Sequence, residues 1–463
     1  MGKLNRKKRD PLLNAPPAQA PQNAKGRLNP LRRRPLDWVL LALALSGLLA
    51  CKTVTRGLYD SSQWPTATAL PTVAVTRSAS ATPQPGASPA ASETAPSASA
   101  VTPQPVETAT LEAIQAALDL YVQAYNENQP ELLDQAIDTS NKPFRRLAQS
   151  RFDDFQKSYR GGSGYPDLWV QSAETRPHGF LLARLQLETG MAADWNFRQV
   201  DGRWVISEPS VEQIGPSETI TSPNFVFTTY PWAEDVNTEL VALMEDARTK
   251  VEGKLGKAPE ERAQVEVRPI YGLDPFTAMG ALAYYQAAGA RGPDKIVIYS
   301  PHSFAYGFFD PEIGWQGDLG QVLVHEYTHM VHNLSFDNAG GKLVSWMSEG
   351  LAEYVSGADY DRVAACRASK QGQRIPLVDR KSKVNKQDLG HMYILDKDRG
   401  LAYAYAYTLV AYIVETHGGL DGFWKLAQAH DELQDMDEAL QQAFGVSLDE
   451  FERDWLEWVE QGC

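Results

Sequence analysis

The chain has 463 residues, of which 43% are hydrophobic and 22% charged, so it is long enough for two or three folded domains with ordinary cores. Its net charge of −14 is uneven: residues 1–35 hold ten Lys and Arg against one acid, and the remainder holds 34 against 57 Asp and Glu. An acidic body repels phosphate, which argues against nucleic-acid binding.

Residues 1–51 form a basic arm followed by an apolar segment. An Arg triplet at 32–34 precedes an almost unbroken apolar run over residues 36–50. This run is short for a membrane span and suits the core of a signal peptide. It ends in Leu-Leu-Ala-Cys at 48–51, which resembles the bacterial lipobox and makes Cys51 a lipidation candidate. A signal anchor that stays in the bilayer is the open alternative. Either one predicts anchoring to the outer face of the bacterial cytoplasmic membrane.

Residues 52–108 are predicted to be a disordered linker. Pro, Ala, Ser and Thr dominate this stretch, and such a composition buries too little apolar surface to offset the entropy cost of ordering the chain. The linker would hold the following domains clear of the membrane.

Residues 109–212 are predicted to form a small α+β accessory domain. Helical spacing of apolar residues covers 111–125 and a second run covers 130–159. Four alternating segments then predict strands, at residues 168–170, 181–187, 195–200 and 203–206. Helices followed by an antiparallel sheet resemble NTF2-like or cystatin-like domains. No catalytic motif is present, so we expect a spacer or a domain that binds an unidentified partner.

Residues 213–463 are predicted to form the last domain, which gives the whole chain an α+β fold class. A helix over 233–255, strands over 265–271 and 295–299 and a further helix are followed by a run of helices to residue 463. We expect a small mixed sheet and a mostly helical lobe.

The segment His325-Glu326-Tyr327-Thr328-His329 carries the chemistry of this domain. Two histidines four residues apart project from one face of a helix and can take two corners of a zinc tetrahedron. Glu326 lies beside them, close enough to act as general base on a metal-bound water without binding the metal.

A second segment, Trp346 to Tyr354, supplies a candidate third ligand, Glu349. Three protein ligands leave one position for water, which is the pattern of a catalytic zinc site. Glu353 follows one helical turn later and could hydrogen-bond a ligand imidazole from outside the metal shell.

The spacing from the His-Glu-x-x-His motif to Glu349 resembles that of the gluzincin metallopeptidases. The Trp-x-x-Glu-Gly-x-Ala-Glu pattern is similar to that of the peptidase MA-like family. The resemblance implies one zinc ion bound by His325, His329 and Glu349, with Glu326 as general base. It also implies a tyrosine that stabilises the oxyanion. The register of the tyrosine-rich segment 403–413 favours Tyr403, with Tyr407 as the alternative.

We therefore expect a zinc metallopeptidase that hydrolyses a peptide or protein substrate outside the cell membrane. Gluzincin aminopeptidases also need an acidic group to hold the free amine, and residues 278–282 have no acid at the comparable place. This slightly favours an endopeptidase over an aminopeptidase. The alternative function is an inactive, peptidase-like binding protein of the cell envelope. Whether Cys366 and Cys463 pair stays open.

Overall fold

A computed structural model of the chain describes residues 76–79, 106–158, 164–273, 282–288, 292–335, 343–357, 360–381, 386–394 and 399–463. The basic arm, the apolar run and Cys51 lie outside the described residues, as do residues 278–281. No helix within the described ranges is long and apolar enough to cross a membrane.

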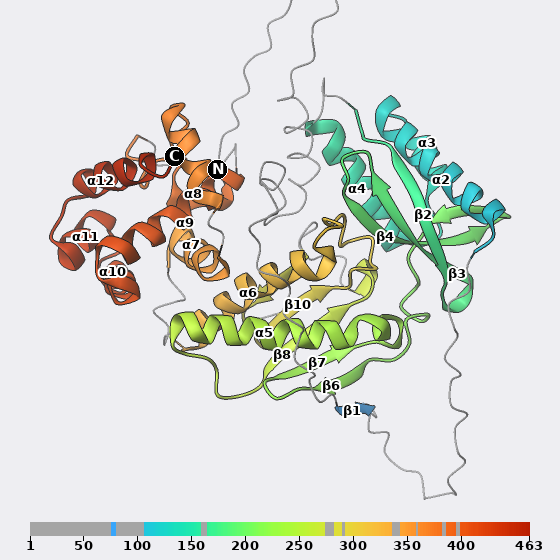
Figure 1. Cartoon of the computed structure of the whole chain (residues 1–463), viewed down its shortest axis with the longest axis horizontal. Coiled ribbons are helices and arrows are strands. Elements are labelled where there is room, and N and C mark those ends of the chain that lie inside the picture. The colour runs from blue at the N-terminus through green and yellow to red at the C-terminus, as the bar shows by residue number, and fades with distance from the viewer. Residues whose placement is uncertain are drawn as a thin grey trace, which may run out of the picture.

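The first folded unit packs three helices against an antiparallel sheet (Figure 1). The helices are α2 (Thr108–Glu127), α3 (Pro130–Ala136) and α4 (Lys142–Ser158), and the sheet has the order β2 (Leu168–Thr175), β3 (Phe180–Leu187), β4 (Ala192–Val200) and β5 (Arg203–Ile206). The helix predicted over 130–159 is broken, because the backbone at Ile137 leaves the helix to pair with Ile206 of β5. Asp138 N–H then donates to the carbonyl of Ile206 at 2.8 Å.

A second, mixed sheet follows, with the strand order β1-β6-β7-β8-β10-β9. Its strands are β1 (Thr76–Ala79), β6 (Glu218–Thr221), β7 (Phe225–Thr229), β8 (Ala263–Arg268), β9 (Ala283–Gln286) and β10 (Lys295–Tyr299). The strand predicted to reach residue 271 ends at Arg268. The neighbours β7, β8 and β10 run parallel, and the remaining pairs are antiparallel. β1, at the edge of this sheet, lies within the stretch that the sequence predicts to be disordered. It pairs antiparallel with β6.

Two long helices pack against the second sheet. They are α5 (Asn237–Leu255), which follows the short 3-10 helix η4 (Pro231–Val236), and α6 (Gly314–Ser335). Apolar side chains of these helices and of the sheet form one core with the helices that follow. The motif residues are therefore carried by a helix held between a sheet and a helical lobe.

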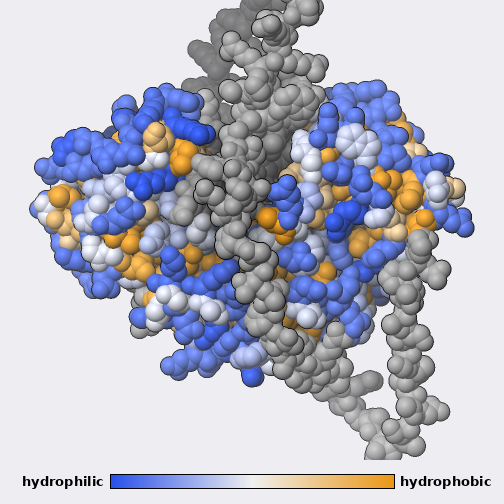
Figure 2. Space-filling view, in the orientation of Figure 1, coloured by the Kyte–Doolittle hydropathy of each residue, from blue (hydrophilic) through white to orange (hydrophobic). Residues whose placement is uncertain are grey.

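The C-terminal lobe is helical, as the sequence predicts. It contains α7 (Ser345–Ser356), α8 (Tyr360–Lys370), the 3-10 helix η7 (Leu389–Ile394), α9 (Arg399–Thr416), α10 (Gly419–Leu433), α11 (Met436–Phe444) and α12 (Leu448–Glu460). Cys366 on α8 forms a disulfide with Cys463, across 97 residues of sequence. This closes the question that the sequence left open. On the face in Figure 2, hydrophilic side chains dominate and hydrophobic ones lie in small, scattered groups.

The two units share a buried interface at the segment between β10 and α6. Phe304 of this segment lies against Trp195 of the first sheet, with ring centroids 4.8 Å apart. Arg151 of α4 donates hydrogen bonds to the carbonyls of Phe304 at 2.6 Å and Ala305 at 2.8 Å. The buried carboxylate of Glu208 accepts from the N–H of Phe304 at 3.0 Å. The first unit therefore holds the segment that leads into the motif helix.

Candidate metal centre

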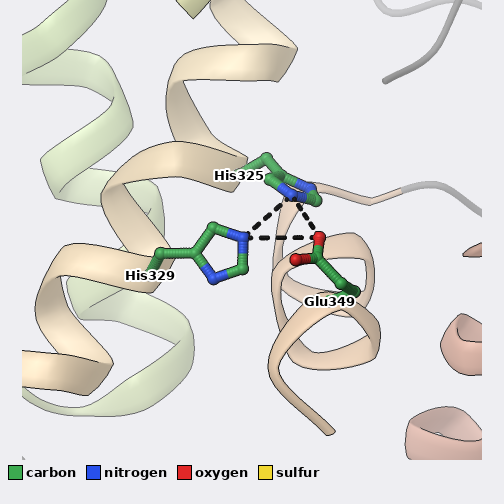
Figure 3. Close-up of side chains that lie close together, drawn as sticks. All are labelled: His325, His329 and Glu349. Carbon is green, nitrogen blue, oxygen red and sulfur yellow. Dashed lines mark hydrogen bonds and ion pairs between the residues drawn. The ribbon is translucent and has the colours of Figure 1, made fainter. Parts of the chain in front are cut away.

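Three side chains from two helices converge on one point (Figure 3). His325 and His329 lie one turn apart on α6, and their Nε2 atoms are 3.1 Å apart. Glu349 on α7 brings its Oε2 to 3.3 Å from Nε2 of His325 and 3.5 Å from Nε2 of His329. The structure thus brings together the three residues that the sequence proposes as metal ligands.

The spacing of these three atoms fits a tetrahedral zinc ion. Ligand atoms bound at 2.0–2.2 Å in a tetrahedron lie about 3.3–3.6 Å from one another. The observed 3.1, 3.3 and 3.5 Å are close to this range. The donor set of two imidazoles and one carboxylate is that of catalytic zinc sites, which keep a fourth position for water.

Each imidazole is also held at its second nitrogen, which leaves Nε2 to face the metal position. Nδ1 of His325 lies 3.0 Å from Oε1 of Glu353, and Nδ1 of His329 lies 3.1 Å from Oγ of Ser348. Such outer partners fix the tautomer and orientation of a ligand imidazole. Glu353 is placed where the sequence suggests, whereas Ser348 was missed. The one feature of the sequence that could have indicated Ser348 is its position directly before Glu349 on the same helix.

The buried charged groups of the site shift one another's pKa values. Burial would lower the pKa of His325, but the negative charges of Glu353, Glu349 and Glu326 outweigh burial and raise that pKa to about 10. Burial would raise the pKa of Glu349, but the neighbouring His329 and His325 hold it well below its usual range. The centre therefore concentrates negative charge where a cation belongs.

Glu326 is buried next to the three ligands and takes no part in their triangle. Burial raises the pKa of its carboxyl group, an effect that the histidines partly oppose. Its Oε2 accepts a hydrogen bond at 2.8 Å from the backbone N–H of Tyr285 on β9. A carboxyl group with a raised pKa beside a metal centre suits a proton acceptor and donor.

The structure separates the tyrosines of α9. The ring of Tyr403 lies beside His325, with centroids 6.5 Å apart. Tyr407 lies instead beside Tyr354, at 6.4 Å, in a separate small apolar cluster. Tyr405 packs against Trp455 of α12. Among the three, Tyr403 is thus the one whose ring neighbours a metal ligand.

A glycine next to Glu349 sets the distance between α7 and α9. A Cβ atom on Gly350 would lie 2.3 Å from the backbone oxygen of Ala406. Only a residue without a side chain permits this approach of the two helices. Gly350 therefore lets α9 bring Tyr403 towards the metal ligands.

Comparison with known protein families identifies a part of the chain. Residues 310–461 match the family described as the Peptidase MA superfamily. The match covers α6 with its two histidines, α7 with Glu349 and the helical lobe. No curated protein and no solved structure matches the chain.

Proposed function

Residues 310–461 form a Peptidase MA superfamily domain, and from this premise we propose that the protein is a zinc-dependent metallopeptidase. The observation that carries the proposal is the triangle of His325, His329 and Glu349, whose ligand atoms are spaced as one zinc ion requires. A peptide or protein is the substrate class that the family implies.

The neighbouring side chains suit the steps of peptide hydrolysis. A zinc ion held by the triangle would polarise the substrate carbonyl and make water more acidic. Glu326 would accept the proton of the attacking water and later give it to the leaving amine. The hydroxyl group of Tyr403 would donate a hydrogen bond to the oxyanion.

We propose endopeptidase rather than aminopeptidase action. The support is the absence of an acidic residue over 278–282, where gluzincin aminopeptidases hold the free amine of the substrate. Peptides with a free and with an acetylated N-terminus distinguish the two. An endopeptidase cleaves both, whereas an aminopeptidase cleaves only the free form.

We propose that the body is anchored to the outer face of the bacterial cytoplasmic membrane. The basic arm followed by the apolar run supports this, and so does the Cys366–Cys463 disulfide, since disulfides persist in oxidising compartments. Replacing Cys51 by Ala separates the two kinds of anchor. Fatty-acid labelling of the parent protein that is lost in Cys51→Ala indicates a lipoprotein, whereas a parent protein that stays in the membrane without taking up the label indicates a signal anchor.

We also propose that residues 109–212 are an NTF2-like or cystatin-like accessory domain preceding a gluzincin-type domain over 213–463. Helices packed on a four-stranded antiparallel sheet support the first assignment. The shared interface suggests that this domain supports the peptidase domain in addition to any partner that it binds.

The decisive experiment compares the zinc-loaded protein with its Glu326→Gln variant in hydrolysis of a peptide library, with and without a chelator. We expect the variant to keep zinc and to lose about 10²- to 10⁴-fold in turnover. Undiminished turnover in the variant would refute the role of Glu326. If the parent protein binds zinc but cleaves no peptide, the alternative of a binding protein stands.

A further inference from the structure

Tyr285 on the edge strand β9 contacts the motif helix α6 at two points. Its backbone N–H donates to Oε2 of Glu326 at 2.8 Å, and its hydroxyl oxygen accepts from Nδ2 of Asn333 at 2.7 Å. Glu326 and Asn333 are two helical turns apart, so both point from the same face of α6. One residue of the strand is therefore bound to the helix at positions about 10 Å apart along its axis.

The same hydroxyl group ties β9 to the start of β10. The Tyr285 hydroxyl donates to Oδ1 of Asp294, and this oxygen also accepts from the N–H of Ala288 at 3.0 Å. Asp294 directly precedes β10, which pairs antiparallel with β9. The phenol thus joins three parts of the fold: the motif helix, the end of β9 and the beginning of β10.

This arrangement bears on the proposed general base. A glutamate side chain has several rotatable bonds, so its position depends on the groups that bind it. The donor to Glu326 is a backbone N–H, whose position is only as fixed as the strand that carries it. β9 has four residues and lies at the edge of its sheet, where strands are held on one side only. The Tyr285 phenol supplies the second support.

We infer that Tyr285 is a positioning residue, which with Asn333 and Asp294 fixes β9 so that its backbone N–H orients the carboxylate of Glu326. The bond engages Oε2 and leaves Oε1 to face the attacking water. This inference rests on the proposed role of Glu326 as general base.

The neighbouring Tyr284 provides a matched control. It is the same residue type, one position earlier on β9, and its side chain points to the opposite face of the sheet. There its hydroxyl accepts from Nη1 of Arg268 at 2.9 Å, and its ring packs against the core of the first unit. Removing this hydroxyl costs a hydrogen bond on the same strand without touching α6.

Steady-state kinetics of the zinc-loaded full chain test the effect on Glu326. We expect Tyr285→Phe to lower kcat about tenfold with KM and zinc content unchanged, because the base is misplaced while the substrate still binds. Tyr284→Phe should keep the parent kcat. If Tyr285 and Asn333 act together, adding Asn333→Ala to Tyr285→Phe should lower kcat no further. A parent-like kcat in Tyr285→Phe, or an equal loss in Tyr284→Phe, would overturn the inference.

Amide-resolved hydrogen exchange gives a readout that does not need activity. The Tyr285 amide should exchange faster in Tyr285→Phe, Asn333→Ala and Glu326→Ala than in the parent, and should be unchanged in Tyr284→Phe. If the parent protein hydrolyses nothing, the proposed function fails. Hydrogen exchange still decides whether the contacts of Tyr285 with Asn333 and Asp294, here called the brace, fix β9. Exchange at parent rates in Asn333→Ala and Tyr285→Phe would refute the brace even if Glu326 proves to be the general base.

Discussion

Oε1 of Glu353 lies 3.0 Å from Nδ1 of His325, while Glu349, one helical turn earlier, approaches Nε2 of the same ring at 3.3 Å. Two carboxylates of one helix thus lie next to the two nitrogens of a single imidazole. A carboxylate on Nδ1 orients the ring and increases the basicity of Nε2, so Glu353 should contribute to metal affinity without binding the metal.

Replacing Glu353 by Ala should weaken zinc binding about 10- to 100-fold, because His325 loses the partner that orients it. Competition with a chromophoric chelator measures this directly. Glu353→Gln retains a hydrogen-bond acceptor for Nδ1 and should lose less. An unchanged affinity in Glu353→Ala would contradict the assigned role.

Replacing Tyr403 by Phe should lower kcat about 10²- to 10³-fold, the usual cost of one oxyanion donor. Zinc content and thermal stability should stay near those of the parent. The control is Tyr407→Phe, which removes the same hydroxyl group from a ring that lies beside Tyr354. A larger loss in Tyr407→Phe than in Tyr403→Phe would reverse the choice between the two.

Replacing Gly350 by Ala should destabilise the protein by about 1–3 kcal/mol, since the new Cβ meets a backbone oxygen that can yield only if α9 moves. Turnover should fall as well, because α9 carries Tyr403. The control is Gly253→Ala in α5, where a Cβ meets nothing within 4 Å. There the change should stabilise the helix by about 0.5–1 kcal/mol. Thermal unfolding of both variants measures the two opposite changes in stability. An unchanged stability of Gly350→Ala would disprove the close approach of the two helices.

Asp235 should make the interface between the two units sensitive to acid. Its carboxylate lies 2.6 Å from Nη1 of Arg176 and 3.1 Å from Nδ1 of His302. Burial would raise its pKa, but the interactions with His302 and Arg176 outweigh burial and hold the pKa below the ordinary 3.8. A lowered carboxyl pKa stabilises the fold above the ordinary value, and the contribution is lost as the pH falls through the lowered value.

The corresponding variant is Asp235→Asn, with Tm measured from pH 7 to pH 2. At neutral pH the variant should melt below the parent, and the difference should shrink as the pH drops below 4 towards the lowered pKa. A difference independent of pH would show that the ion pairs contribute nothing.

The metal ligands were predictable because their relation is local. His325 and His329 belong to one helical turn, and Glu349 follows 20 residues after His329 in the chain. The partner of Glu326 was not predictable, because Tyr285 lies 41 residues earlier in the chain and reaches α6 only through the strand pairing of β9. The periodicity of a sequence predicts which side chains of a strand share a face. It does not predict which other elements lie next to that strand.

The broken helix over 130–159 has an origin that is partly local. Local signals interrupt the apolar spacing directly after Ile137: residues 138–142 are polar, and Pro143 stands in the first turn of α4. Oδ1 of Asn141 accepts a hydrogen bond from the N–H of Phe144 at 3.3 Å, as a residue that caps a new helix does. The partner of the break was not predictable, because the backbone of Ile137 pairs with that of Ile206, 69 residues later. Four strands of the structure were not predicted from the sequence: β1, β6, β7 and β9. They are short, and their register depends on partners elsewhere in the chain.

The contacts that support the metal centre begin long before residue 310, where the family match starts. Arg151 and Glu208 hold the approach to α6, and Tyr285 binds Glu326. A fragment cut at the match would keep every metal ligand and lose the surroundings that arrange them. For gene fusion or domain exchange, the piece to move runs from α2 to α12.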